Sequence, residues 1–275
     1  MPLPNLIVIG ASKCGTTSLH RYLARHPQIA MSRDKELDFF IAERNWPKGV
    51  EWYAARFPAG TAIRGESSPS YTRAPFYSGV PPRMHAIVPD ARLVYMVRDP
   101  VDRIVSNWIH ATAQGDETRP LAEAVHDDYY FARSLYWYQI SAYLEYYPRA
   151  RILVLAMVDL ANDRRAALRR VYEFLDVDPD FPGPARDIRK NRTASKRLKT
   201  PAGAWIERSW VGRSLGALPQ RWYWRLRDPL YWPFSRRVER PALGEHERAA
   251  LAERLREDAN RFREFAGREF TGWCV

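Results

Sequence analysis

A lysine inside a glycine-bounded loop near the start of the chain has the chemistry to bind a phosphate group. Residues 10–15 follow an apolar run, 6–9, and precede a stretch in which apolar side chains recur at helical spacing. A strand, a tight loop and a helix in this order present backbone N–H groups and the positive end of a helix dipole to an anion. Lys13 adds a side-chain charge to the same loop.

This loop differs from the loop that binds nucleoside triphosphates. In that motif a lysine follows the second glycine, and a hydroxyl residue comes next. Here Thr16 stands where that lysine belongs, and Lys13 lies inside the loop. From this position a lysine reaches an oxygen near the 5′ end of a nucleotide rather than a γ-phosphate. An ordinary strand–turn–helix with an incidental lysine is the alternative interpretation.

A second strand-to-helix stretch carries another cation. Residues 92–97 have the composition of a buried strand, and Arg98 follows directly. Asp99 is the expected N-cap of the next helix and Pro100 its first residue, which places Ser106 about two turns into that helix. Because ligands of open α/β sheets bind at the carboxyl ends of the strands, we expect Arg98 and Ser106 near that edge.

Together, the two stretches resemble the nucleotide-binding signatures of sulfotransferases that use 3′-phosphoadenosine 5′-phosphosulfate (PAPS). The 5′-phosphosulfate loop of that family reads K-x-G-T-[TS], and its 3′-phosphate motif reads R-[DN]-P…R…S, which Arg103 also matches. The resemblance implies a sulfuryl donor, PAPS, bound without a metal ion. The residues that it implies for donor binding are Lys13, Cys14, Gly15, Thr16, Thr17, Ser18, Arg98 and Ser106.

Glu36 is the candidate general base, with Lys13 as the group that stabilises the leaving phosphate. Residues 35–40 resemble the K-E-x-x-F-F segment of heparan sulfate-type sulfotransferases, whose Glu takes the proton of the acceptor. A positioned carboxylate contributes roughly 10²–10⁴-fold to such a reaction. Two alternatives stay open: a surface Glu36 paired with Lys35 or Arg33, and Asp38 as the group that orients the acceptor or accepts its proton.

One lysine of the heparan sulfate-type pattern is missing. Those enzymes read E-K-[ST]-x-x-Y, with the lysine near the transferring group, whereas here Glu66 is followed by Ser67. Either Lys13 stabilises the leaving group alone, or an arginine from elsewhere in the chain substitutes.

Two late segments are candidates for the rest of the site. In the family a late basic loop meets the 3′-phosphate, which implies Arg192 and Lys196, with Arg197, although a solvated linker is an equal alternative. Residues 203–240 are rich in tryptophan and arginine. Such a segment suits a glycan or lipid-linked acceptor, a lid, a peripheral membrane contact, or simple packing on the core.

The elements that must position these residues alternate between strands and helices. Further strands are expected within 61–71 and over 151–156, and helices over 16–26, 49–58, 100–113, 133–147, 163–175 and 245–266. This alternation predicts an α/β fold: a single domain, 1–275, with a central, mainly parallel β-sheet flanked by helices. The length of 275 residues suffices for one such domain.

Composition limits the class of protein. With 46% hydrophobic residues the chain is globular, and no stretch has the length of a membrane span. The two cysteines do not indicate a structural disulfide, so we expect a cytoplasmic protein, with contact to the inner face of the membrane left open. The net charge of +11 suits polyanionic ligands, but no nucleic-acid-binding module is present.

The sequence therefore predicts an enzyme that moves the sulfuryl group of PAPS to a hydroxyl, or an amine, of a carbohydrate, glycolipid or natural-product acceptor. The other product is 3′-phosphoadenosine 5′-phosphate (PAP). Two rival functions are a P-loop-type nucleotide kinase or ATPase, and a non-catalytic basic protein that binds polyanions or membranes. The kinase is disfavoured because Thr16 replaces the motif lysine and no second magnesium carboxylate is evident.

Overall fold

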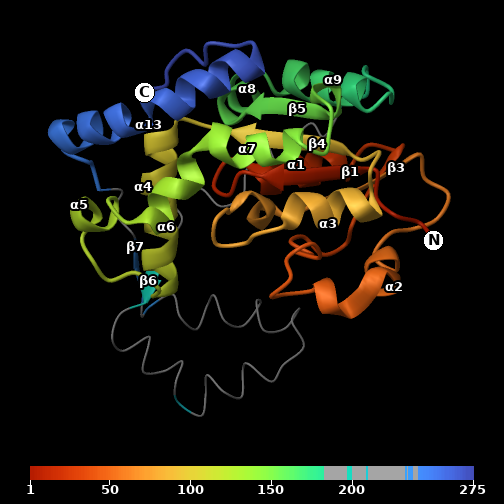
Figure 1. Cartoon of the computed structure of the whole chain (residues 1–275), viewed down its shortest axis with the longest axis horizontal. Coiled ribbons are helices and arrows are strands. Elements are labelled where there is room, and N and C mark those ends of the chain that lie inside the picture. The colour runs from red at the N-terminus through yellow and green to blue at the C-terminus, as the bar shows by residue number, and fades with distance from the viewer. Residues whose placement is uncertain (183–196, 200–208, 210–232, 234, 238–240) are drawn as a thin grey trace.

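A five-stranded parallel sheet forms the centre of the computed structural model, which describes residues 1–182, 197–199, 209, 233, 235–237 and 241–275. The strand order is β2-β3-β1-β4-β5, and every neighbouring pair in this sheet is parallel (Figure 1). A separate antiparallel pair joins β6 to β7. The strands are β1 Leu6–Gly10, β2 Ile29–Met31, β3 Ile63–Ser67, β4 Arg92–Val97, β5 Ile152–Ala156, β6 Arg197–Lys199 and β7 Ser235–Arg237.

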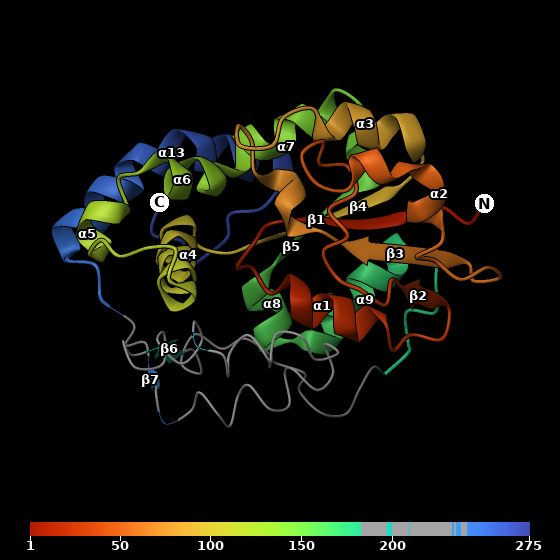
Figure 2. The same cartoon turned by 90° about the horizontal axis from the view of Figure 1, so that it is seen from below.

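Helices cover both faces of the sheet. Figure 2 shows α3 and α7 on one side of the strands, and α1, α8 and α9 on the other. The longer helices are α1 Thr16–Leu23, α3 Val80–Ile87, α4 Pro100–Gln114, α7 Tyr136–Leu144, α9 Arg164–Phe174 and α13 Glu245–Ala266. The shorter ones are α2 Gly49–Ala54, α5 Leu121–Ala124, α6 Asp128–Phe131 and α8 Met157–Asn162.

The central strands are the most apolar because both of their faces are covered. All five residues of β1 are buried, as are five of the six in β4. β1 pairs with β3 on one side and β4 on the other, so the loops after β1 and β4 leave the sheet next to each other. Such a switch point in the strand order is where open α/β sheets bind ligands. The fold thus brings residues 11–15 and Arg98 to one edge.

The structure confirms the predicted α/β class and most of the predicted elements. Within the described ranges it adds β2, β6, β7, α3, α5, α6 and α8, and it shortens several of the predicted helices. β2 was not predicted, because its three residues are too few for a recognisable pattern. The helix predicted over 133–147 covers only Tyr136–Leu144. Its first turn is set by Asp258 of α13, whose carboxylate accepts hydrogen bonds from Trp137 N at 3.0 Å and Tyr138 N at 2.8 Å.

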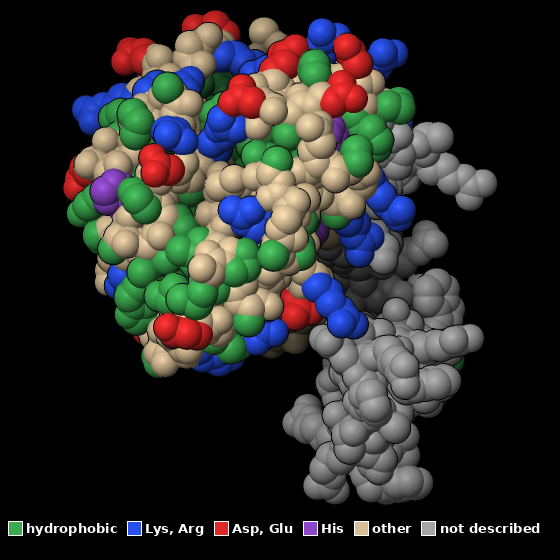
Figure 3. Space-filling view, turned by 90° about the vertical axis from the view of Figure 1, so that its right-hand side faces the viewer, with side chains coloured by type: hydrophobic (Ala, Val, Ile, Leu, Met, Phe, Trp, Pro, Cys, Tyr) green, Lys and Arg blue, Asp and Glu red, His purple; other side chains and the backbone are tan. Residues whose placement is uncertain are grey.

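The surface charge is mixed where it can be seen. On the face in Figure 3, Lys and Arg side chains lie among Asp and Glu rather than in a band of one sign. Among the helices within the described ranges, none combines the length and the hydropathy needed to cross a lipid bilayer.

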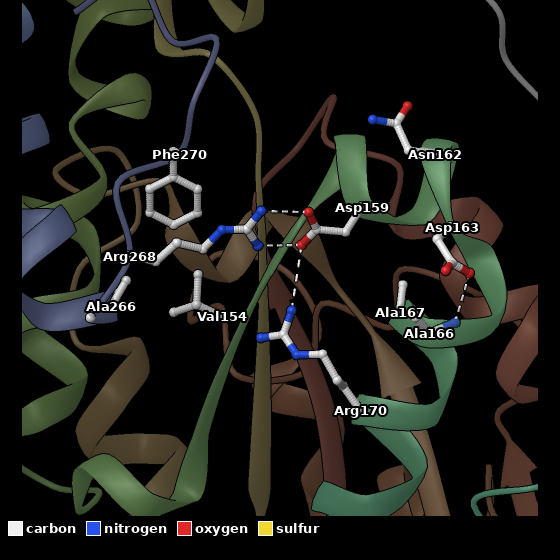
Figure 4. Close-up of a pocket in the computed structure, with 11 residues that line it drawn as sticks. Val154, Asp159, Asn162, Asp163, Ala166, Ala167, Arg170, Ala266, Arg268 and Phe270 are labelled. Carbon is white, nitrogen blue, oxygen red and sulfur yellow. Dashed lines mark hydrogen bonds and ion pairs between the residues drawn. The ribbon is translucent and has the colours of Figure 1, made fainter.

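An ion pair ties the C-terminal segment to the helix that follows β5. Asp159 on α8 accepts from both terminal nitrogens of Arg268, the second at 2.6 Å, and lies 3.5 Å from Arg170 Nη1 (Figure 4). These side chains line a hollow of about 490 Å³ beside α9. Its Asp163 caps α9 by accepting from Ala166 N at 2.9 Å. The charged groups of this hollow therefore stabilise the fold by binding one another.

Replacing Asp159 by Asn should lower the free energy of unfolding by about 1 kcal/mol, because the bidentate pair with Arg268 is lost. Thermal unfolding should then show a midpoint lower by about 2–4 °C. The matched control is Glu253→Gln, which removes the fully solvated pair with Arg256 at 2.6 Å. An equal loss of unfolding free energy in the two variants would show that the Asp159–Arg268 pair stabilises the fold no more than an exposed pair does.

Candidate functional site

The loop after β1 presents the start of α1 to an open space. Gly15 is the N-cap of α1 and has a φ of 89°, and a Cβ there would lie 3.2 Å from Met157 Cγ. Both observations explain why only glycine suits this position. The N–H of Ser18 donates to Gly15 O at 3.0 Å. A helix leaves the N–H groups of its first residues without an acceptor inside the helix, so those of Thr16 and Thr17 suit an anion. Local sequence therefore builds half of an anion site.

Both predicted phosphate motifs line one cavity of about 510 Å³. The phosphate loop and the start of α1 contribute one part of the lining; Arg98 comes from the segment between β4 and α4, Ser106 from α4, and Glu36 from the segment after β2. Of the predicted residues, the structure brings these together in the lining: Lys13, Gly15, Thr16, Thr17, Ser18, Glu36, Arg98 and Ser106. The rest of the lining is Ser12, Tyr22, Lys35, Pro69, Arg73, Asn107, His110, Gln114, Met157, Leu160 and Ala161.

Arg98 is held at the edge of the sheet by contacts that leave part of its guanidinium unused. Its Nη2 donates to Asp102 Oδ2 at 3.1 Å, and Asp102 also accepts from Arg248 of α13. Asp99 caps α4 as predicted, accepting from Asp102 N at 2.7 Å. Arg98 Nε is buried and has no hydrogen-bond partner. A buried donor of this kind suits a ligand oxygen.

The side chain of Cys14 lies beneath the loop rather than in the cavity. It is fully buried, and its Sγ is 3.5 Å from Tyr136 Oη. Burial raises the pKa of the thiol despite the nearby charge of Arg103. The backbone N–H of Cys14 donates to Ala11 O at 3.2 Å. The structure thus gives the predicted binding residue Cys14 a place in shaping the loop.

Arg103 supports the loop from behind. Only 1% of it is exposed, its Nε donates to Ser12 O at 3.0 Å, and its Nη1 donates to Ser134 Oγ at 3.0 Å. The motif match in the sequence pointed to this residue but not to its role. It fixes the main chain next to Lys13.

Several lining residues were missed from the sequence. On α4, His110 and Gln114 follow Ser106 at intervals of four, so the helical period was a signal that they share its face. Lys35 belongs to the K-E-x-x-F-F match but was not assigned to the site. Arg73 carried no signal, because it lies on irregular backbone.

Glu36 lies in the cavity with a partner beside it. Its backbone N–H donates to Ser67 O at 2.9 Å, and its Oε1 accepts from Lys35 Nζ at 2.6 Å. Burial alone would raise the pKa of Glu36, but the charge and hydrogen bond of Lys35 outweigh it and lower the pKa. The carboxylate is therefore ionised at neutral pH. The proposed pairing with Lys35 is real, and it occurs at the cavity wall.

Asp38 points elsewhere. Its carboxylate forms an ion pair with Arg44, only 5% of its side chain is exposed, and it does not line the cavity. Burial, opposed by Arg44, raises its pKa. The alternative in which Asp38 accepts the proton therefore has no geometric support.

A buried carboxylate holds the segment that carries Glu36. Glu66 has no exposed surface, and its oxygens accept from Tyr53 Oη at 2.7 Å, Tyr71 Oη at 2.8 Å and Ser68 Oγ at 2.6 Å. Two of these hydroxyls reach the main chain of the segment: Tyr71 Oη accepts from Phe39 N at 2.9 Å, and Ser68 Oγ accepts from Asp38 N at 3.0 Å. Glu66 thereby orients the backbone next to Glu36.

Some predicted residues lie outside the described ranges. Arg192 and Lys196 are among them, and so is most of 203–240. Arg197 begins β6. Within the described ranges, no group of three or more His, Cys, Asp or Glu side chains is arranged to hold a metal ion.

Comparison with known proteins gives consistent matches. A family model described as the sulfotransferase domain matches residues 3–202. A human bifunctional heparan sulfate N-deacetylase/N-sulfotransferase 2 is 27% identical over 230 residues, which are 74% of this chain and 24% of that protein. The membrane-associated sulfotransferase kil1 of Dictyostelium discoideum is 40% identical over 111 residues, 38% of this chain and 22% of that protein. The matched region thus spans about a quarter of the length of these curated relatives.

Among solved structures, a sulfotransferase from Alicyclobacillus acidocaldarius has the same fold. Its TM-score is 0.72 at 24% sequence identity, and the match covers 100% of both chains.

The buried Glu66 should make stability depend on pH. Burial raises its pKa from 4.5 to about 7, against the three hydrogen bonds that lower it, so folding takes up a proton in this window. The resulting stabilisation is complete below pH 4.5 and is lost as pH rises through 7, at about 1.4 kcal/mol per pH unit within the window. Urea unfolding should therefore show that the free energy of unfolding of the wild type exceeds that of Glu66→Gln by less at pH 8 than at pH 5.

The exposed Glu145 provides the control. Glu145→Gln should track the wild-type curve at each pH. A wild-type advantage over Glu66→Gln that stayed constant from pH 5 to pH 8 would contradict the assignment of this titration to Glu66.

Proposed function

We propose, for a chain that belongs to the sulfotransferase domain family, that it transfers the sulfuryl group of PAPS to a hydroxyl or amine acceptor. One observation supports this most strongly: two phosphate motifs far apart in the sequence line the same cavity, and a carboxylate, Glu36, lines it with them. Neither motif alone distinguishes PAPS from other nucleotides. A cavity lined by cationic groups from two separate motifs suits an adenosine that carries phosphates at both ends.

The residues present fit this donor. Lys13 and the start of α1, with Gly15, Thr16, Thr17 and Ser18, would hold the 5′-phosphate. Arg98, whose Nε has no partner in the described structure, would hold the 3′-phosphate with Ser106. The donor supplies the sulfuryl group. Arg192 and Lys196 remain proposed further contacts to the 3′-phosphate.

The chemistry of the chain's own residues follows from their charges. Glu36, ionised at neutral pH, would take the proton of the acceptor as the acceptor oxygen or nitrogen forms its bond to sulfur. The bond between sulfur and the bridging oxygen breaks in line, and its electron pair stays on the 5′-phosphate. Lys13 would stabilise that charge, and the positive side chains would do so without a metal ion. Glu36 then returns its proton to water.

The acceptor is proposed at the level of class. The names of the relatives include heparan sulfate N-sulfotransferases, which supports a carbohydrate acceptor and leaves both hydroxyl and amine groups in the proposal. A glycolipid or natural product fits the same chemistry. A cytoplasmic location and contact with the inner membrane face remain proposals too, the latter supported by the name of the kil1 relative.

Replacing Glu36 by Gln should lower sulfuryl transfer by roughly 10²–10⁴-fold, because no carboxylate is left to take the acceptor proton. Calorimetry should show PAP bound with nearly unchanged affinity. The measurement is a screen of acceptors with labelled PAPS, read by mass spectrometry. Glu43→Gln, an exposed carboxylate of the same segment, is the control. Unchanged turnover in Glu36→Gln would remove Glu36 from this role.

Replacing Arg98 by Ala should weaken PAP binding by roughly 10–100-fold, the value of charge-assisted hydrogen bonds to a phosphate. Adenosine 5′-phosphosulfate, which lacks the 3′-phosphate, should bind the variant and the wild type alike. The control is Arg92→Ala, at the amino end of β4, where Arg92 pairs with Asp176. A kinase or ATPase would show no wild-type preference for the 3′-phosphorylated nucleotide, and that result would refute PAPS as donor.

A further inference from the structure

We propose that Arg73 binds the oxygens of the transferring sulfuryl group and supplies, beside Lys13, a second positive charge there. The inference rests on the proposed function and names a further catalytic residue of the same site. No sequence motif marked Arg73.

Arg73 lies between the phosphate loop and the proposed base. Its Nη2 donates to Ser12 Oγ at 3.1 Å, and Ser12 directly precedes Lys13. Its charge is also one of those that lower the pKa of Glu36. Arg73, Lys13 and Glu36 all line the same cavity. In an in-line transfer, the sulfuryl group must lie between the leaving phosphate and the acceptor, which is the space that Arg73 borders.

The backbone around Arg73 is held rigidly by α7. Tyr143 Oη donates to Tyr71 O at 2.9 Å on the one side. On the other side, Gln139 accepts from Ala74 N at 2.9 Å and donates to Ala74 O at 2.7 Å. Contacts of this kind fix the start of the side chain before any ligand arrives. A positive group placed in advance stabilises developing charge without a cost of reorganisation.

The charge of Arg73 is poorly balanced by the protein. Burial lowers its pKa, and its buried Nε has no hydrogen-bond partner. The nearby Asp38 is paired with Arg44. Arg133, 5% exposed, adds a second positive charge, and its guanidinium lies 3.6 Å from the ring centre of Tyr129.

Within the part of the chain that the structure describes, neither Arg73 nor Arg133 is in an ion pair with a carboxylate. Buried cations are costly unless an anion offsets them. An anionic group bound in the cavity would supply that offset.

Ser67, the last residue of β3, stands where heparan sulfate-type enzymes have a lysine near the transferring group, and a serine supplies no positive charge. Ser67 has no exposed surface, and its Oγ lies 3.0 Å from His20 Nδ1. It does not line the cavity. Arg73 would therefore act on the sulfuryl oxygens while Lys13 acts on the bridging oxygen. Arg73 forms no covalent bond and gives up no proton, so the balance of the transfer is unchanged.

The test compares PAPS with PAP, which differ by the sulfuryl group. Arg73→Ala should weaken PAPS binding by roughly 10-fold or more, change PAP binding little, and lower turnover by roughly 10²–10³-fold, as for loss of one oxyanion donor. The slow release of sulfate from PAPS to water provides a turnover measurement that needs no acceptor. Arg73→Lys should retain part of the activity. Millimolar guanidinium should restore part of the turnover of Arg73→Ala.

The control is Arg83→Ala, a structural arginine whose guanidinium donates to Phe40 O at 2.8 Å and Ser78 O at 2.6 Å. This variant should lose thermal stability and keep the wild-type ratio of PAPS to PAP affinity, with no response to guanidinium. Equal losses of PAPS and PAP binding in Arg73→Ala would show that Arg73 only braces Ser12. Wild-type turnover in Arg73→Ala would overturn the inference alone, whereas a wild-type protein that ignores both nucleotides would overturn the proposed function and this inference together.

Discussion

The gathering of three arginine side chains around one loop, one of them buried and two partly buried, is the constraint on which the rest of the structure depends. Arg103 behind the loop, Arg73 beside it and Arg98 at the end of β4 place three guanidinium groups within reach of one cavity wall. Of the three, only Arg98 is in an ion pair within the described ranges. Because buried charge without a counter-ion is costly, this arrangement favours a protein that binds a polyanion at this edge.

The elements around the cavity hold its lining residues in place. The first wall of the cavity is rigid because β1 is buried on both faces and α1 begins directly after its loop. The part of the lining that Glu36 forms depends on Glu66, which orders the segment of Glu36 through hydroxyl groups rather than through ion pairs. The raised pKa of Glu66 is the cost of placing that carboxylate in the core. At this carboxylate, stability is thus exchanged for the position of the segment that carries Glu36.

The predictions from sequence succeeded where the cause is local. Asp99 caps α4 because its side chain reaches an N–H group three residues away, and α13 covers Glu245–Ala266 because its period is regular over its whole length. They failed where a residue distant in the sequence determines the local structure. α7 starts at Tyr136 because Asp258 receives its first N–H groups, and no pattern within 133–147 contains that information. Tyr136 is also distant in the sequence from Cys14, and it lies 3.5 Å from the Cys14 thiol and so sets where that side chain packs. The place of Cys14 in donor binding stays a prediction.

The sequence by itself determined the two phosphate motifs, the α/β class and four of the five strands of the central sheet, since these follow from residue types at short spacing. Only the tertiary structure decided that Lys13, Glu36 and Arg98 share one cavity, that Asp38 turns to Arg44, and that Arg73 lies beside the loop. The reason is physical. Neighbouring strands of a parallel sheet are joined by long crossover connections, so they are distant in the sequence. Which residues meet at the edge of the sheet therefore depends on which strands become neighbours.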